Sequence, residues 1–269
     1  MTPVGAGRWL KGVADRGIRN LADRHTIRTV DVLGVQARFK CVTPHELGRL
    51  STFGGEPIVL GALQRLRPRD CFYDIGANIG LYTVLAARLV GAGGTIVAFE
   101  PEGANFARLQ ANARLNGLSQ VVACPFALSD RTGPARLRLH SSMTGEGGHA
   151  LVGGAEGDTT VFCLPLDQVL ETFGIRQPDH IKIDVEGHEE QVLAGMARVL
   201  ASSSLRTVIL EAHYYDQQSD GRVHYGDAEL AQKRRRLLAI LGRHRFLVAG
   251  EQVTSEGGAR FAHLLFTRD

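Results

Sequence analysis

The sequence of 269 residues contains few cysteines, one tryptophan and no long apolar run. The cysteines form no CxxC pair and most fall in expected strands, which favours buried thiols in a reducing compartment. No stretch approaches the roughly 20 consecutive apolar residues that a membrane-spanning helix needs. The first twenty residues carry Arg8, Lys11 and Arg16 and lack the apolar centre of a signal peptide. We therefore expect a cytoplasmic protein that has no membrane partner.

A strong charge of one sign is also missing. The formal net charge is only +3, which is too weak to indicate a nucleic-acid partner. The basic run 233–236 lies on the polar side of an expected leucine-bearing helix, where a solvated face is its ordinary role. The apolar content of 44% and the charged content of 22% are those of a globular protein that buries a full core.

Strand and helix patterns alternate from Asp70 onward, which favours a parallel sheet covered by helices. Apolar residues at helical spacing come after the first, second, fourth and fifth of these strands, so a helix is expected after each. Two more strands, separated by a turn-rich stretch, are expected to close the sheet as an antiparallel pair. The seven expected strands cover residues 71–75, 95–100, 121–124, 180–185, 207–213, 244–250 and 260–266.

The segment 1–67 is expected to form an N-terminal extension to a main domain of residues 68–269. It contains a short helix near Trp9–Leu21, a hairpin over 26–42 and a helical segment near 57–66. Inside the main domain, two further segments interrupt the series of strands and helices. Residues 127–140 resemble a small hairpin, and residues 141–158 hold six glycines, typical of a mobile loop that is either a substrate lid or a surface insertion.

A glycine loop follows the first expected strand, at the place where open α/β sheets bind cofactors. Gly76 and Gly80 allow the backbone to turn tightly and to approach a ligand. Asn78 stands where the dinucleotide motif GxGxxG requires glycine, so that motif is not met. Asp74 would repel a pyrophosphate but suits the cationic ammonium of S-adenosylmethionine, unless it only caps the turn. Glu100 closes the second strand, where a carboxylate can accept both ribose hydroxyls.

The end of the fourth strand carries the candidate catalytic groups. Methyl transfer to an alcohol requires an acceptor in line with the methyl group and a base for the hydroxyl proton. Asp184 is expected to position the acceptor, and Glu186 or His188 to act as the base. Their alternatives are a charge at the helix N-terminus for Glu186 and an exposed helix residue for His188. Lys182 is expected to form a salt bridge with Asp184 or Glu211.

A divalent metal ion is a further candidate cofactor at this edge of the sheet. Asp184, Glu211 and His213 come from the ends of adjacent expected strands, and carboxylates with imidazole are suitable ligands. The spacing is not diagnostic of a metal site, so the metal remains open.

Four segments together resemble the FkbM family of methyltransferases: FYDIGANIGLYT (72–83), FEPEGANFARLQANARLN (99–116), ALSD (127–130) and IKIDVEGHEEQVLAG (181–195). The resemblance implies a Rossmann-like class I methyltransferase fold, an α/β fold with a mostly parallel sheet and a C-terminal antiparallel hairpin. It implies O-methylation of a small-molecule hydroxyl, on a polyketide, a sugar or another secondary metabolite. It also places around S-adenosylmethionine the residues Asp74, Gly76, Asn78, Glu100 and Asn105, with Phe126 and Ala127 near the adenine.

Two other functions are compatible with part of this pattern. An NAD-dependent oxidoreductase would share the glycine loop, but Asn78, Asp74 and the terminal hairpin argue against it. A catalytically silent scaffold protein would keep the fold but would not need acidic side chains near the strand ends. This chain carries four of them, Asp74, Glu100, Asp184 and Glu186. The resemblance covers roughly residues 70–215, and the glycine-rich loop 141–158 matches no part of the family.

Overall fold

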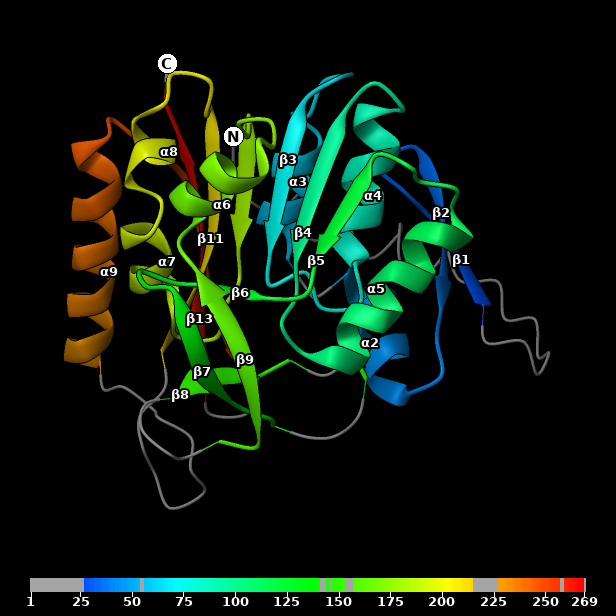
Figure 1. Cartoon of the computed structure of the whole chain (residues 1–269), viewed down its shortest axis with the longest axis horizontal. Coiled ribbons are helices and arrows are strands. Elements are labelled where there is room, and N and C mark those ends of the chain that lie inside the picture. Colours follow the sequence, from blue (N-terminus) through cyan, green and yellow to red (C-terminus); the bar gives the residue numbers. More distant parts are fainter. Residues whose placement is uncertain are drawn as a thin grey trace, which may run out of the picture.

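The computed structural model describes residues 27–53, 56–140, 144–145, 147–152, 157–214, 227–256 and 259–268. Its centre is a seven-stranded sheet of order β12-β13-β11-β10-β3-β4-β5 (Figure 1). The strands from β11 to β5 are parallel, whereas β13 is antiparallel to both β11 and β12, as expected from the sequence. The bounds are β3 Cys71–Ile75, β4 Thr95–Phe99, β5 Val121–Cys124, β10 His180–Ile183, β11 Thr207–Tyr214, β12 Leu247–Glu256 and β13 Ala259–Thr267.

Helices cover both faces of this sheet, which explains why its central strands are buried throughout and mostly apolar. Every residue of β3 and β10 is buried. One apolar cluster lies between the sheet and α3 and α4, and a second lies between the opposite face and α6 to α9. The helices are α3 Pro57–Leu63, α4 Leu81–Val90, α5 Gly103–Leu115, α6 Leu166–Phe173, α7 Glu189–Ala194, α8 Ala197–Ala201 and α9 Asp227–Arg243.

The segment before the large sheet forms a hairpin and two short helices. Strands β1 (Ile27–Val32) and β2 (Val35–Lys40) pair antiparallel around Leu33 and Gly34, both with positive φ, as in a tight hairpin turn. This confirms the predicted hairpin, which packs through β2 on α4 and α5. Helix α2 (Pro44–Thr52) was not expected. The helix predicted near Trp9–Leu21 lies outside the described residues.

A second, four-stranded sheet has the order β6-β9-β7-β8 and lies beneath the carboxyl ends of the large sheet (Figure 1). The hairpin predicted over 127–140 is wrong, because β9 lies between β6 and β7. Strand β6 has only two residues, too few to pair with β7 as a hairpin. Instead β9 pairs with both strands, and its residues Val161 and Cys163 fill a small apolar core. The bounds are β6 Ala127–Leu128, β7 Gly133–Arg138, β8 Ala150–Val152 and β9 Thr159–Leu164.

The single helix expected after β10 is instead two short ones, α7 and α8, separated at Gly195. A Cβ atom on Gly195 would lie 1.9 Å from the backbone oxygen of Ser129, so the chain bends where it touches the loop after β6. The last two strands also run further than expected, through the stretch that looked rich in turns. All four cysteines are free, as predicted.

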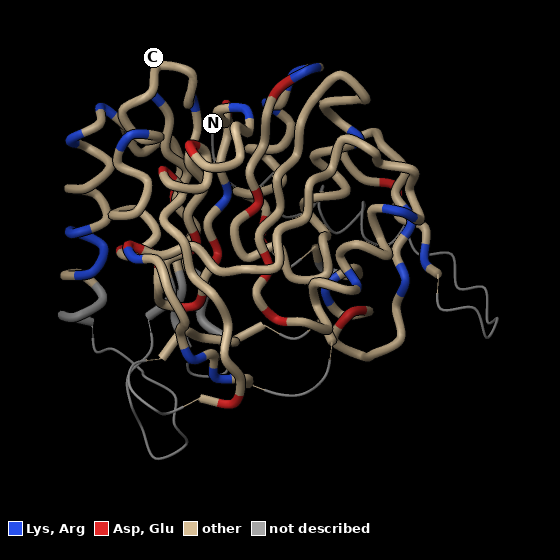
Figure 2. Tube along the Cα trace, viewed as in Figure 1, with Lys and Arg blue, Asp and Glu red and all other residues tan. Residues whose placement is uncertain are grey.

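The basic run on α9 lies on a partly solvated face as expected, with Arg235 and Arg236 exposed, and Lys233 is the exception. Lys233 is buried and contacts Glu189 at 2.5 Å. Arg234 pairs with Glu251, and Arg236 pairs with Glu190. Figure 2 shows basic and acidic segments interspersed along the chain, with α9 on the outer side of the molecule. Within the described part of the chain, no helix is long and apolar enough to cross a membrane.

Candidate active site

A cavity of about 650 Å³, including its open mouth, lies at the carboxyl ends of β3, β4 and β10. This is the edge where α/β sheets bind their ligands. Most of the residues predicted from the sequence line this cavity, although they come from segments far apart in the chain. These are Gly76, Asn78, Glu100, Asn105, Phe126, Ala127, Asp184, Glu186 and His188.

Gly76 brings the first strand end directly against the fourth. Its φ is +78°, a conformation that residues with a side chain rarely adopt. A Cβ atom here would stand 1.7 Å from the backbone oxygen of Asp184. The N–H of Asp184 also donates to the carbonyl of Ile75 at 3.0 Å, so the two chain segments are joined at the cavity floor. The position therefore requires glycine for close packing as well as for its backbone angles.

Glu100 is fixed in the cavity wall by two backbone donors. Its Oε2 accepts from the N–H of Asn78 at 2.7 Å, and its Oε1 accepts from the N–H of Glu102 at 2.9 Å. Burial raises the pKa of Glu100 to about 7, against the lowering effect of these two hydrogen bonds. Each carboxylate oxygen has two lone pairs, so both oxygens can still accept a hydroxyl from a ligand.

Asn105 is 1% exposed and presents an unused donor at the same cavity. Its Oδ1 accepts from the N–H of Gly145 at 2.8 Å. Its Nδ2 makes no hydrogen bond to any residue that the structure describes. A buried amide without a partner is costly, so this donor suits a bound ligand. Phe126 completes an apolar part of the wall and meets the ring of Phe99 edge-on, with centroids 5.7 Å apart.

Two predicted cofactor residues, Asp74 and Gly80, do not belong to the described lining of the cavity. Asp74 is buried beneath the glycine loop, where its Oδ2 accepts the hydroxyl of Thr83 at 2.5 Å. Burial raises its pKa, while Lys182 lowers it. A Cβ atom on Gly80 would come 2.5 Å from Cδ1 of Leu109, so this glycine lets α4 and α5 approach. A direct contact of Asp74 with the cofactor ammonium remains a prediction.

The predicted ion pair of Lys182 is confirmed. Its Nζ lies 2.9 Å from Oδ2 of Asp184 and 5.4 Å from the centre of the Tyr82 ring. Burial by itself lowers the pKa of Lys182, but the carboxylates of Asp184, Asp74, Glu56 and Glu211 raise it above its ordinary value. Lys182 is therefore charged, and it holds the carboxylate of Asp184 at the cavity wall.

Glu186 and His188 line the opposite part of the cavity. Glu186 has φ +49°, and its Oε1 accepts from the N–H of Gly148 at 2.7 Å. Nε2 of His188 lies 2.9 Å from the hydroxyl of Ser129, which in turn donates to Asp130 at 3.1 Å. Burial lowers the pKa of His188 below its ordinary value, so the imidazole is neutral at pH 7.

Arg49 and the glycine segment that it contacts also belong to the site, and neither was predicted from the sequence. Arg49 lines the cavity from α2 and donates through Nε to the carbonyl of Gly145 at 2.6 Å. A signal for this helix was present, because Thr43 and Glu46 form a capping box with Pro44 at the first helical position. Part of the 141–158 segment thus forms cavity wall, through Gly147, Gly148, His149 and Leu151.

The predicted metal ligands are arranged differently from the expectation. Glu211 lies against His263, with Nε2 of the imidazole 3.1 Å from its Oε2, and Asp184 is paired with Lys182. The side chain of His213 is outside the described part of the structure. The three residues Asp184, Glu211 and His213 are therefore not seen to converge.

Comparisons with known proteins show which family the chain is similar to. The family profile described as the Methyltransferase FkbM domain matches residues 74–245. The hexuronic acid methyltransferase AglP of Haloferax volcanii is 31% identical over 185 residues, covering 68% of this chain and 73% of that protein. The 31-O-demethyl-FK506 methyltransferase FkbM of Streptomyces tacrolimicus is 32% identical over 217 residues, covering 70% and 76%.

Solved structures with a similar chain path include methyltransferases of low sequence identity. A precorrin-6y C5,15-methyltransferase from Geobacter metallireducens has a TM-score of 0.46 and 14% identity, covering 80% of this chain and 87% of that one. A methyltransferase FkbM from Methylobacillus flagellatus has a TM-score of 0.47 and 15% identity, covering 83% and 55%.

Proposed function

Because this chain belongs to the FkbM family and is an S-adenosylmethionine-dependent methyltransferase, we propose that it methylates a hydroxyl of a sugar-like small molecule. One observation carries the proposal. A single cavity at the carboxyl edge of the sheet gathers a buried carboxylate, an unused amide donor, a lysine-held aspartate and a neutral imidazole.

The cofactor half of this cavity is the part near the glycine loop. Glu100 would accept the ribose hydroxyls, Asn105 would donate through Nδ2, and Phe126 with Ala127 would cover the adenine. Gly76 and Asn78 would present backbone to the ligand. When bound, S-adenosylmethionine supplies a methyl group on a positively charged sulfur. The ionised form of Glu100 suits this neutral ribose better than it would suit a nucleotide phosphate.

The acceptor half is polar, which favours a sugar over an apolar macrolide. Arg49, His149, Glu186 and His188 line it together with Asp184. These groups can hydrogen-bond a molecule with several hydroxyls, and Arg49 can also pair with an acceptor carboxylate. One of the relatives is a hexuronic acid methyltransferase. A hexuronic acid or its glycoside is therefore the acceptor we test first.

His188 would take the proton from the acceptor hydroxyl, and Asp184 would hold the acceptor in place. If Ser129 donates its proton to Asp130, its oxygen accepts from Nε2–H of His188, and Nδ1 is the basic nitrogen. Glu186 is already bound to the backbone of Gly148, so it orders the cavity wall. General base catalysis of this kind contributes about 10²–10⁴-fold to the rate.

The test measures S-adenosylhomocysteine released with three acceptors: a glucuronide, the matching neutral glucoside and a macrolide alcohol. We expect turnover with the sugars and a lower KM for the glucuronide, an advantage that Arg49→Ala removes. Turnover with the macrolide alone would contradict the sugar proposal.

A second experiment separates the roles of the two candidate bases. His188→Gln should lower kcat by about 10²-fold or more, while Glu186→Gln should chiefly raise KM. Full turnover of His188→Gln would show that another group removes the proton. Calorimetry should detect binding of S-adenosylmethionine and none of NAD.

A further inference from the structure

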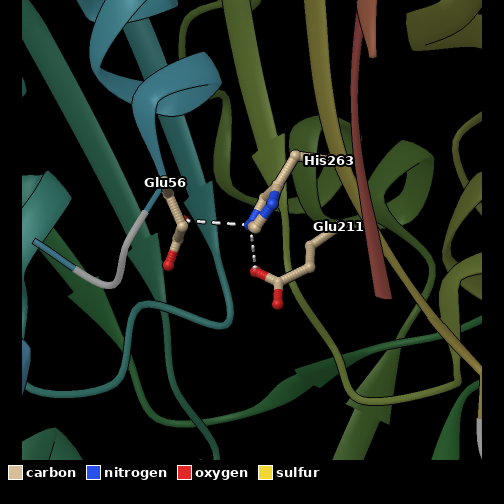
Figure 3. A group of neighbouring side chains, drawn as sticks. All are labelled: Glu56, Glu211 and His263. Atoms are coloured by element: carbon tan, nitrogen blue, oxygen red, sulfur yellow. Dashed lines mark ion pairs between the residues drawn. The ribbon is translucent and has the colours of Figure 1, made fainter. Parts of the chain in front are cut away.

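Three buried side chains from different parts of the chain converge on the face of the sheet that α3 covers. Glu56 directly precedes α3, Glu211 lies on β11 and His263 lies on β13. Glu211 and His263 are directly opposite each other in the antiparallel ladder, so their side chains point to the same face. Figure 3 shows the two carboxylates turned toward one imidazole. The residues are 5%, 8% and 0% exposed, respectively.

The distances in this group suit a metal ion. Nε2 of His263 lies 3.1 Å from Oε2 of Glu211 and 3.5 Å from Oε2 of Glu56. One ligand atom from each residue lies within 4.8 Å of the other two. Atoms bound about 2.0–2.2 Å from one metal lie roughly 2.8–3.6 Å apart, from right-angled to tetrahedral geometry. The two separations from Nε2 of His263 fall in that range.

Glu56 supplies an independent sign that a ligand is expected. Its side chain is more than nine-tenths buried, and its Oε2 accepts no hydrogen bond from the residues that the structure describes. Its nearest basic group is Nε2 of His263, which forms an ion pair with it at 3.5 Å, longer than an ordinary hydrogen bond. A buried carboxylate oxygen that accepts no hydrogen bond is costly, and a cation between Glu56 and its neighbours would reduce that cost.

The surrounding charges also favour a cation. Lys182 is surrounded by four carboxylates, those of Asp184, Asp74, Glu56 and Glu211. Including His263, acidic side chains in this group outnumber basic ones, and Glu56 and Glu211 both lie against the imidazole. Buried charges are stable only when they are paired or bound to a metal. A divalent cation between Glu56, Glu211 and His263 would face two of these carboxylates directly.

We propose that Glu56, Glu211 and His263 bind one divalent transition-metal ion, Zn²⁺ or Mn²⁺. Two carboxylates and an imidazole are ligands that these ions accept, with water filling the remaining positions. Mg²⁺ and Ca²⁺ fit less well, because they prefer oxygen ligands alone. None of the three ligands lines the described cavity, so the ion would stabilise the packing of α3 on β11 and β13 and would not contact the acceptor.

The experiment measures metal binding itself and is therefore independent of the methyl-transfer proposal. The full chain is treated with a chelator, dialysed, and titrated with Zn²⁺ and with Mn²⁺ by calorimetry. We expect one ion per chain and a rise in the melting temperature. Glu211→Gln and His263→Asn should each weaken binding by more than the roughly 10–100-fold that loss of an outer-shell partner costs.

His180→Asn is the matched control. His180 is another buried histidine facing a carboxylate, with Nε2 3.1 Å from Oδ2 of Asp70. It lacks the third ligand, so this variant should bind the metal like the unchanged protein. If the β-strand variants do not fold, Glu56→Gln, which alters only the residue before α3, replaces them.

Two results would overturn the proposal. The first is the absence of saturable binding of either ion to the unchanged chain, in which case the group is an ion triad around a protonated His263. The second is binding that survives Glu56→Gln in a folded protein at unchanged affinity, which would place the ion elsewhere.

Discussion

Replacing Gly76 by alanine should damage the protein at the point where its first and fourth parallel strands meet. The added Cβ would stand 1.7 Å from the backbone oxygen of Asp184 and 2.8 Å from the carbonyl carbon. The strand ends would have to separate by more than about 1 Å to reach normal contact. That movement would break the hydrogen bond from Asp184 N–H to the carbonyl of Ile75.

The magnitude follows from three costs. A side chain at φ +78° costs about 1–2 kcal/mol. The lost backbone hydrogen bond costs about 1 kcal/mol, and the overpacking typically costs about 1–3 kcal/mol. The free energy of unfolding should therefore fall by roughly 3–6 kcal/mol, a large part of the about 5–15 kcal/mol that such a domain possesses.

Gly91→Ala is the matched control for this substitution. Gly91 also has a positive φ, +70°, but a Cβ there would meet no heavy atom within 4 Å. It should lose only the backbone cost, about 1–3 kcal/mol, because φ +70° with ψ −177° is a conformation that almost only glycine adopts. Urea denaturation gives both stabilities, and calorimetry gives the affinity for S-adenosylmethionine. If Gly76→Ala is as stable as Gly91→Ala and binds the cofactor equally well, the packing argument is wrong.

Three other perturbations test the remaining parts of the site. Because burial lowers the pKa of His188, kcat should stay constant as the pH falls from 7 to the ordinary histidine pKa and should decrease only at lower pH. His188→Gln should not show this decrease at acid pH. Affinity for S-adenosylmethionine should rise as pH increases through about 7, where Glu100 ionises and accepts the ribose; in Glu100→Gln titration calorimetry should show weaker, pH-independent binding. Lys182→Met should lower the free energy of unfolding by about 3–5 kcal/mol, because it leaves Asp184 and its neighbours uncompensated. Denaturant unfolding checks this against Lys40→Met at an exposed position, and equal losses would contradict it.

The parallel core of the fold could be predicted because each of its strands is marked locally. Strand β3 is a run of buried residues that ends at a glycine loop, and β10 is the same kind of run ending before Asp184. Carboxyl ends of parallel strands meet at one edge, so Glu100 and Asp184 could be placed together from the order of elements alone. The division of the chain near residue 67 and the contact of Asp74 with the cofactor remain predictions.

The order of the smaller sheet could not be predicted, since β9 enters between β6 and β7 from a distant part of the chain. Two short strands that follow each other in the sequence suggest a hairpin. In the folded chain β9 takes the hydrogen-bonding edges of both β6 and β7, so these two strands do not pair with each other. Arg49 was missed because its helix was not recognised, although the capping box from Thr43 to Glu46 marked its start.

The sequence by itself determined the methyltransferase family, the parallel sheet and the strand-end residues, because each depends on a short pattern and on the rule that strand ends share an edge. Tertiary structure alone decided that Asp74 is buried beneath the loop and that Arg49 reaches the cavity. It also decided that Glu56, Glu211 and His263 meet. The contacts of Arg49 and of the Glu56, Glu211 and His263 group depend on antiparallel register and on helix packing between residues far apart in the chain, and no local pattern encodes them.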